Sequence, residues 1–200
     1  MAARSVHLYV LDTFADWEPS YAAARLNDPA WQRDPGRYRV RTVADNWARV
    51  RSMGGLSVVP DLVVEDLNPA TSALLILPGA NSWEAGAGEA VVVKAAEFLA
   101  AGVPVAAICG ATYGLAAAGL LDERRHTSNS LEFLQGAPGY GGARHYVEAR
   151  AVADRGLITA PAVGAVEFAA AIFQELEVFE PELIEGWVRL FAAREPVAAG

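Results

Sequence analysis

The chain has only one cysteine among its 200 residues, so it cannot form an internal disulfide. A single free thiol is typical of the reducing cytoplasm, where we expect the protein to act. The three histidines, His7, His126 and His145, lack the close spacing of metal ligands. We therefore expect neither a metal site nor any other cofactor.

Long apolar runs and excess positive charge are lacking as well. No apolar segment reaches the about 20 residues that a membrane-spanning helix needs, and the start of the chain is too mixed for a signal peptide. The formal net charge of −8 argues against nucleic acid and anionic membrane surfaces as partners. We expect a small-molecule substrate rather than either of these partners.

The hydrophobic content of 53% is ample for one large core, and the length predicts a single domain over residues 1–200 with a disordered tail at 195–200. Strand patterns alternate with helix patterns along the chain, which predicts a mostly parallel sheet covered by helices on both faces. We expect strands at 5–11, 38–44, 72–77, 103–108, 124–128, 146–153 and 157–160, a hairpin at 47–59, and helices at 16–27, 89–101, 110–119, 163–178 and 181–193.

Cys109 lies between the apolar strand pattern at 103–108 and a helix pattern of small residues at 110–119. A thiol at this junction occupies the sharp strand–helix turn on which α/β enzymes carry a nucleophile. Helix N-termini lower the pKa of thiols, so the sequence predicts a Cys109 thiolate with a pKa well below the about 8.5 of a free thiol. The alternative is a buried structural cysteine.

Other residues should converge on the same place. Glu18, Gly79 and Cys109 each follow a strand, and the carboxyl ends of parallel strands meet at one edge of a sheet. A protonated Glu18 can donate a hydrogen bond to the thiolate. Gly79 and Gly110 can offer backbone N–H groups to an oxyanion. The alternatives are a solvated acid at a helix start and ordinary turn glycines.

Taken together, these segments resemble the ThiJ/PfpI superfamily, which is related to class I glutamine amidotransferases. The resemblance covers residues 5–176 and rests on the elbow at 107–112, the Leu-Pro-Gly turn at 77–79, the acidic segment at 14–18 and the final strand and helix at 157–169. It implies a flavodoxin-like three-layer α/β sandwich in which Cys109 acts beside Glu18. It also implies that the turn supplies a backbone donor for an oxyanion.

The third catalytic position departs from the pattern that this resemblance implies. Many members of the superfamily carry a Thr-Thr-His or Thr-Ser-His segment after the elbow helix, whereas Asn129 follows Thr127 and Ser128 here. Asn129 can hydrogen-bond a substrate but cannot transfer a proton. His126 precedes the pair and would have to swing in from the other face of a strand. We keep both, His126 as a catalytic candidate and Asn129 as a substrate-binding one.

The resemblance implies a cysteine-dependent enzyme for a small electrophilic substrate: hydrolysis of amides or peptides, hydration of isonitriles, or conversion of dicarbonyls such as methylglyoxal. Glutaminase activity is not expected, because residues 159–163 lack the histidine of amidotransferases. The alternatives are a redox-sensing stress-response protein with an oxidisable Cys109, or an intracellular protease or amidase. Relatives commonly dimerise near the site, and Trp31, Tyr38 and Trp47 would suit an interface if exposed, so we expect a homodimer. The alternative for these three aromatics is packing in the core.

Overall fold

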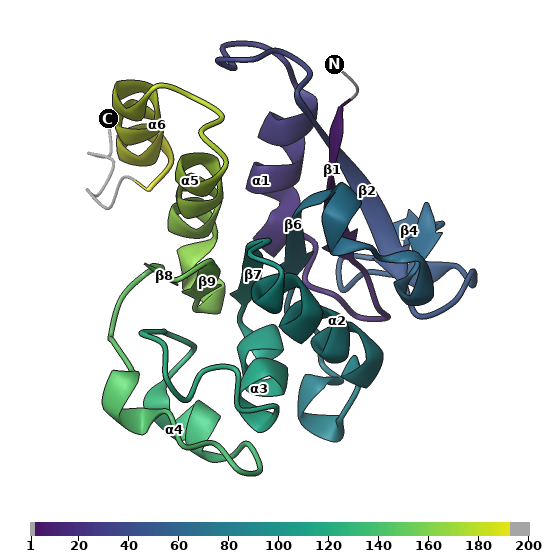
Figure 1. Cartoon of the computed structure of the whole chain (residues 1–200), viewed down its shortest axis with the longest axis vertical. Helices are drawn as coiled ribbons and strands as arrows, with labels where there is room; N and C mark the ends of the chain where they lie inside the picture. Colours follow the sequence, from purple (N-terminus) through teal and green to yellow (C-terminus); the bar gives the residue numbers. More distant parts are fainter. Residues whose placement is uncertain (1–2, 193–200) are drawn as a thin grey trace, which may run out of the picture.

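A computed structural model describes residues 3–192, which form a central sheet between two layers of helices (Figure 1). The strand order is β5-β2-β1-β6-β7-β9-β8, and only β8 runs antiparallel to its neighbour. The predicted flavodoxin-like α/β fold is therefore confirmed. The strands are β1 (Arg4–Tyr9), β2 (Tyr38–Ala44), β5 (Leu62–Val63), β6 (Ser72–Leu77), β7 (Val105–Ile108), β8 (Val152–Asp154) and β9 (Leu157–Ala160); β3 (Val50–Arg51) and β4 (Ser57–Val58) form the predicted hairpin.

Helices cover both faces of the sheet. Helix α1 packs on α5, and α5 on α6, whereas α2 and α3 lie together on the opposite side (Figure 1). The α-helices are α1 (Trp17–Asn27), α2 (Glu89–Ala100), α3 (Gly110–Ala117), α4 (Leu131–Gln135), α5 (Ala165–Glu175) and α6 (Pro181–Phe191). The 3-10 turns are η1 (Val64–Asp66), η2 (Pro69–Thr71), η3 (Trp83–Ala85), η4 (Ala143–His145) and η5 (Ala162–Gly164). No helix within residues 3–192 is long and apolar enough to cross a membrane.

The core lies on both sides of the central strands. Every residue of β6, β7 and β9 is buried, which is why these strands are apolar without alternation. Helix α3 is built from small residues because the buried Trp83 ring lies against it. A Cβ on Gly114 would come within 2.7 Å of that ring. The Trp83 indole N–H donates to the Pro78 carbonyl at 2.9 Å, which fixes the ring beside the Leu-Pro-Gly turn.

Two of the predicted strands are wrong. Residues 124–128 and most of 146–153 form loops, with one isolated bridge between His126 and Tyr146. Side-chain hydrogen bonds replace a strand ladder here: the Thr127 N–H donates to the Thr159 hydroxyl at 2.9 Å, and the Thr127 hydroxyl donates to the Ala149 carbonyl at 3.1 Å. Helix α4, whose first turn is capped by Ser130, was not among the predicted helices.

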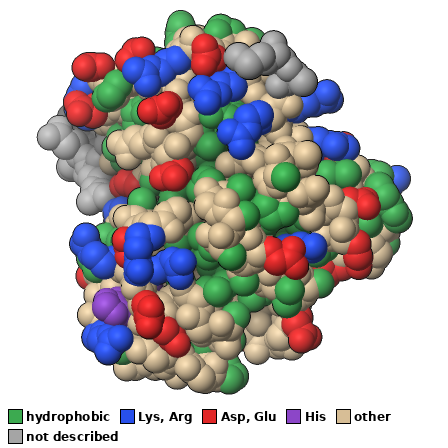
Figure 2. Space-filling model, in the orientation of Figure 1, with side chains coloured by type: hydrophobic (Ala, Val, Ile, Leu, Met, Phe, Trp, Pro, Cys, Tyr) green, Lys and Arg blue, Asp and Glu red, His purple; other side chains and the backbone are tan. Residues whose placement is uncertain are grey.

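The aromatic residues predicted at a dimer interface differ in their exposure to solvent. Tyr38 is only 6% exposed and donates to the Leu176 carbonyl, so of its two predicted roles it has the one in the core. Trp31 and Trp47 are 74% and 62% exposed. Acidic and basic side chains are interspersed over the face shown in Figure 2. The tail predicted at 195–200 lies outside the described residues.

Candidate active site

Cys109 occupies a strained turn between β7 and α3. Its backbone angles, φ 57° and ψ −126°, lie outside the regions that L-residues favour, as at other nucleophile elbows. Such a conformation costs about 1–3 kcal/mol and persists only where neighbouring contacts enforce it. Here the Cys109 N–H donates to the Ala160 carbonyl of β9 at 2.9 Å, and its carbonyl accepts from the Thr112 hydroxyl at 2.6 Å. The half-buried sulfur therefore lies at the carboxyl edge of the sheet.

Glu18 reaches the sulfur from the first turn of α1. Its side chain is fully buried beside Cys109, since Glu18 Oε2 and the Cys109 sulfur lie 2.9 and 3.0 Å from the place of a Cβ on Gly79. One carboxyl oxygen, Oε2, accepts the Gly79 N–H at 2.6 Å. The other, Oε1, is buried without a partner among the described atoms. Asp16, at the N-cap, uses its carboxylate to hold the hairpin through Ser52 instead of capping α1.

The two groups compete for one proton. Burial raises the pKa of Glu18 to about 7, although the Gly79 N–H favours the carboxylate. Burial and the neighbouring Glu18 charge raise the pKa of Cys109 to about 11, although hydrogen bonds from Asn129 and Gly110 favour the thiolate. Because two adjacent anions repel, Glu18 loses its proton first. The predicted low pKa of Cys109 is wrong, since burial and the carboxylate outweigh the helix N-terminus.

Gly79 contributes differently from the prediction. Its N–H is engaged by Glu18 and therefore is not free for an oxyanion. A Cβ at this position would lie 2.9 Å from Glu18 Oε2 and 3.0 Å from the Cys109 sulfur, so only glycine lets the turn approach both groups. Gly110 keeps its N–H directed at the sulfur, where it remains a candidate donor.

Asn129 occupies the third position beside the sulfur. Its amide nitrogen donates to the Cys109 sulfur at 3.3 Å, while its Oδ1 accepts the Ala162 N–H at 2.9 Å. Because a backbone N–H can only donate, this second bond fixes which end of the amide faces the sulfur. Asn129 is exposed at the rim, so its NH2 group can also reach a bound substrate.

His126 does not reach the sulfur. The ring is fully buried, with Nδ1 at 2.7 Å from the Arg124 carbonyl and Nε2 at 2.7 Å from the Tyr140 hydroxyl. A carbonyl can only accept, so Nδ1 carries the proton and Nε2 accepts from Tyr140. Burial lowers the pKa of His126. This histidine is thus a neutral structural group, and the catalytic role considered for it has no support in the geometry.

A pair of hydroxyls that the sequence reading overlooked joins the elbow to the Asn129 segment. The Thr112 and Ser128 hydroxyl oxygens are 2.6 Å apart in the interior. Thr112 donates its proton to the Cys109 carbonyl, so Ser128 donates to Thr112. The neighbouring Thr-Ser-Asn sequence was the available signal for this link, because polar residues beside a buried elbow require partners.

Among the described residues, no group of three His, Cys, Asp or Glu side chains is arranged to hold a metal ion. Of the described side chains, Asn129 donates to the sulfur and Glu18 lies beside it. Chemically, the arrangement offers a nucleophile, one carboxyl group able to exchange a proton near neutral pH, and two hydrogen-bond donors.

The chain is similar in sequence and structure to known proteins. Residues 4–175 match the sequence model of the DJ-1/PfpI family. A Bacillus subtilis protein named uncharacterized protease YoaZ is 37% identical over 198 residues, 98% of this chain and 94% of that protein. A thiJ/pfpI family protein from Bacillus anthracis is 35% identical with a TM-score of 0.90, covering 98% of this chain and 93% of that one. A DJ-1 superfamily protein from Agrobacterium tumefaciens is 33% identical with a TM-score of 0.84, covering 95% and 98%. The chain therefore belongs to the DJ-1/PfpI family.

Proposed function

We propose that the protein is a cysteine-dependent enzyme acting on a small electrophilic carbonyl compound, with Cys109 as nucleophile and Glu18 as the proton-transfer group. One observation carries the proposal: the Glu18 carboxyl is fully buried beside the Cys109 sulfur, and this burial raises the pKa of Glu18 to about 7. General acid–base groups work best when their pKa lies near the working pH. Glu18 meets this condition without a histidine.

The first step follows from this pairing. As the Cys109 sulfur attacks the carbonyl carbon, its proton moves to the Glu18 carboxylate and the carbonyl electron pair moves to oxygen. The Gly110 N–H and the Asn129 amide, which point at the sulfur, donate hydrogen bonds to the oxyanion that forms next to it. Glu18 then returns the proton to this oxygen, which leaves a neutral thiohemiacetal.

A 1,2-dicarbonyl suits the remaining chemistry. In its thiohemiacetal, the Glu18 carboxylate removes the proton from the carbon bound to sulfur, the C–H electron pair forms the double bond of an enediol, and the neighbouring carbonyl oxygen takes up a proton. Glu18 then returns its proton to the neighbouring carbon, while the hydroxyl on the carbon bound to sulfur loses its proton and becomes a carbonyl. The result is a thioester, and water releases a 2-hydroxy acid and restores the Cys109 thiol. The oxidation of one carbon balances the reduction of the other, so no external oxidant is needed.

Turnover of methylglyoxal, an isonitrile and a chromogenic amide tests the proposal. We expect hydroxy-acid formation from methylglyoxal by the wild type and none by Cys109→Ser. Glu18→Gln should retain a thiol but lose turnover. If none of the three compounds is converted while peroxide oxidises Cys109 stoichiometrically, the enzyme proposal fails and a redox-sensing role replaces it.

The name of the Bacillus subtilis relative favours amide hydrolysis as a second candidate. A protonated Glu18 would then donate to the departing amine, as an acylated Cys109 forms. Amide cleavage requires acid catalysis of the leaving group, whereas dicarbonyl conversion requires removal of a proton from carbon. Cleavage of the chromogenic amide by the wild type and not by Cys109→Ser would therefore support amide hydrolysis, whereas slower conversion of dideuterated than of ordinary glyoxal would support the dicarbonyl reaction.

We also propose that the protein is a homodimer and that it acts in the reducing cytoplasm. The exposed Trp47 on the hairpin supports an interface, because large aromatic groups are enriched where proteins associate. Light scattering of the full chain at micromolar concentration should give twice the chain mass. A monomer mass would reject the dimer but leave the proposed chemistry standing.

A further inference from the structure

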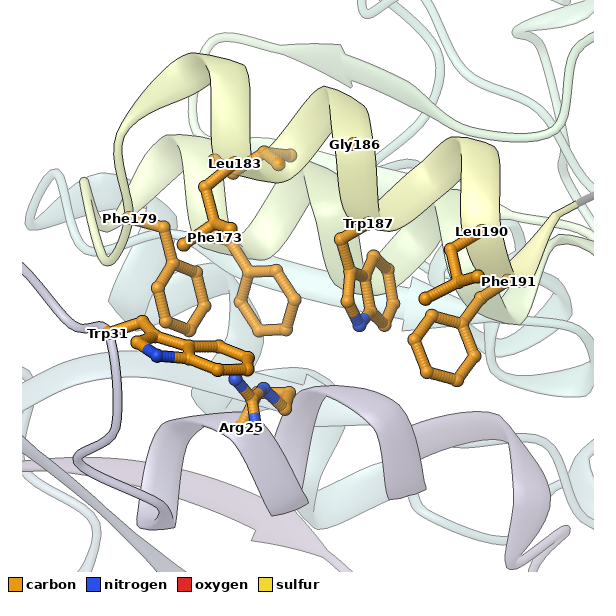
Figure 3. Close-up of a pocket in the computed structure, with 10 residues that line it drawn as sticks. Arg25, Trp31, Phe173, Phe179, Leu183, Gly186, Trp187, Leu190 and Phe191 are labelled. Atoms are coloured by element: carbon orange, nitrogen blue, oxygen red, sulfur yellow. The ribbon is translucent and has the colours of Figure 1, made fainter.

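A groove separate from the active site lies between α1 and α6 (Figure 3). Its volume is about 370 Å³, within the range typical of small-molecule sites. Arg25, in the last turn of α1, is the only charged residue among the described residues lining it. Glu18 lies in the first turn of the same helix and is not among the residues that line the groove. The aromatic lining residues are Trp31, Phe173, Phe179, Trp187 and Phe191.

Trp31 at the rim combines two unfavourable features. Its φ of 65° is left-handed, which is rare for a bulky residue, and its side chain is 74% exposed. Figure 3 shows the Trp31 ring lying across the groove near Phe173 and Phe179. A strained backbone that holds a large apolar side chain in water indicates a role for that side chain.

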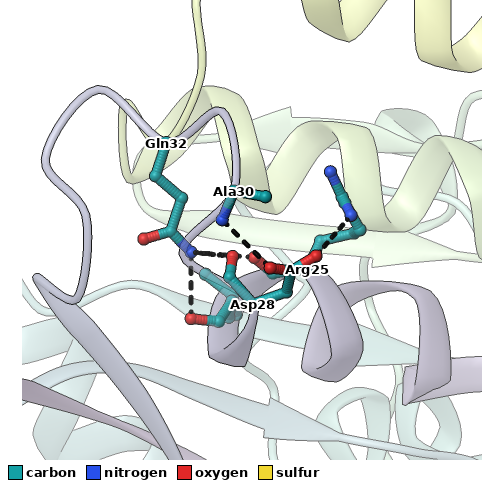
Figure 4. Close-up of polar contacts among 5 residues, drawn as sticks. Arg25, Asp28, Ala30 and Gln32 are labelled. Carbon is teal, nitrogen blue, oxygen red and sulfur yellow. Dashed lines mark hydrogen bonds and ion pairs between the residues drawn. The ribbon is translucent and has the colours of Figure 1, made fainter.

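The loop that carries Trp31 is fixed by polar contacts. The buried Gln32 amide donates to the carbonyls of Arg25 at 2.9 Å, Leu26 at 3.1 Å and Asp28 at 2.8 Å, which are left unpaired at the end of α1 (Figure 4). Its oxygen accepts the Gly36 N–H at 3.2 Å. These contacts hold the loop, and thereby the Trp31 backbone, in the strained conformation.

A second tie joins the same loop to the start of α6. The Arg33 guanidinium donates to both carboxyl oxygens of Glu180, at 2.8 and 3.0 Å. The Arg33 N–H also donates to the Val178 carbonyl at 2.9 Å. The rim is therefore anchored to both helices that border the groove, and its shape is largely formed before any ligand binds.

The charges in the groove favour a neutral ligand. The Arg25 guanidinium lies over the rings of Trp31 and Phe179, with centroids at 5.2 and 5.7 Å. Its positive charge repels a ligand cation, and it already covers one face of each of these two rings. The same guanidinium pairs with Asp28 at 2.9 Å, which weakens its attraction for an anion (Figure 4).

The aromatic wall favours a flat ligand. Phe173 meets Phe179 edge to face at 5.1 Å and Trp187 at 5.4 Å, while Phe191 is tilted against Trp187 at 5.1 Å. Such walls present both edges and faces, which receive a further aromatic ring in stacked or T-shaped contact. We propose that this groove binds a neutral, flat aromatic molecule, which packs against the rings of α5 and α6 beside Trp31. This site is independent of the Cys109 chemistry.

Nile red, which is neutral, flat and fluorescent in apolar surroundings, tests the proposal on the full chain. Titration should saturate at one dye per chain. Trp31→Ala should weaken binding about 2- to 12-fold, the loss expected for one aromatic contact. Trp47→Ala is the matched control, since Trp47 is 62% exposed on the hairpin, and it should leave affinity unchanged. Leu190→Glu, at a 73% exposed position of the wall, should abolish binding.

Circular dichroism and the Cys109 alkylation rate must match the wild type in each variant, which separates loss of the groove from loss of the fold. Equal effects of Trp31→Ala and Trp47→Ala would overturn the proposal. Tighter binding of cationic thioflavin T or anionic anilinonaphthalene sulfonate than of Nile red would overturn the preference for a neutral ligand. A dimer mass that Leu190→Glu halves, without saturable dye binding, would assign the groove to a second copy instead.

Discussion

Replacing Glu18 by Gln should make the protein more stable above neutral pH. Burial raises the pKa of Glu18 in the folded chain from its ordinary 4.5 to about 7. A raised folded pKa gives stability that is fully present below pH 4.5 and is lost as the pH rises through 7. Gln matches the protonated acid in shape, and its oxygen can still accept the Gly79 N–H.

The magnitude follows from the same values. One pKa unit corresponds to about 1.36 kcal/mol, so ionising Glu18 in the folded chain removes about 3 kcal/mol from the free energy of unfolding. The variant should equal the wild type near pH 4.5 and exceed it by this amount near pH 8.5. A gain of this size at the expense of turnover would be a trade of stability for activity.

Another buried group changes stability in the opposite direction over part of this range. Burial lowers the pKa of His7 from 6.5 to about 4. Between pH 4 and 6.5 the unfolded chain therefore binds a proton at His7 that the folded chain does not, and the free energy of unfolding rises with pH. His7 is present in both proteins, so its contribution cancels in the difference between them.

Urea unfolding, followed by tryptophan fluorescence under reducing conditions from pH 4.5 to 8.5, measures this difference. The expected curve rises with pH and levels off above about 7. A difference that stays within 0.5 kcal/mol (about the error of such comparisons) at every pH would refute the argument, because Glu18 would then ionise alike in folded and unfolded chains.

Three further outcomes follow from the site. Iodoacetamide should modify Cys109 slowly at pH 7 and faster toward pH 10, because the pKa of the Cys109 thiol is raised to about 11. Glu18→Gln should speed the reaction at pH 8, because it removes the carboxylate charge beside the thiol. A modification rate that does not change with pH would contradict this. His126→Ala should lower the free energy of unfolding by about 2–4 kcal/mol, since it leaves the Tyr140 hydroxyl and a carbonyl unpaired, yet preserve turnover per folded molecule; lost turnover with intact stability would restore its catalytic role. Gly79→Ala should reduce both turnover and melting temperature, because the alanine Cβ would lie 2.9 Å from Glu18 Oε2. Wild-type values for both quantities would contradict this, because they would show that the turn can move without disturbing the site.

The elbow and the sheet were predictable because they depend on local patterns. A continuous apolar run before Cys109 and small residues after it are typical of a buried strand, a tight turn and a closely packed helix, and these form here as β7 and α3. Parallel strands also bring their carboxyl ends together, so the convergence of Glu18 and Gly79 on Cys109 followed from topology alone.

The loops after α3 were not predictable in the same way. Residues 124–128 were predicted as a short strand, but here the Thr127 N–H and hydroxyl donate to Thr159 and Ala149, on segments distant in sequence. The choice between His126 and Asn129 depended on this path. Only the folded loop turns His126 toward Tyr140 and directs the Asn129 amide to the sulfur.

The sequence by itself determined the layered α/β fold, the place of Cys109 at the strand–helix elbow and the family, because each depends on residue type and local spacing. The tertiary structure alone decided the protonation of the site. The pKa of Cys109 depends on how deeply the sulfur is buried and on the distance to the Glu18 charge, and both are set by packing between segments far apart in the chain. For the same reason, the aromatic groove under Trp31 appears only when α1, α5 and α6 come together.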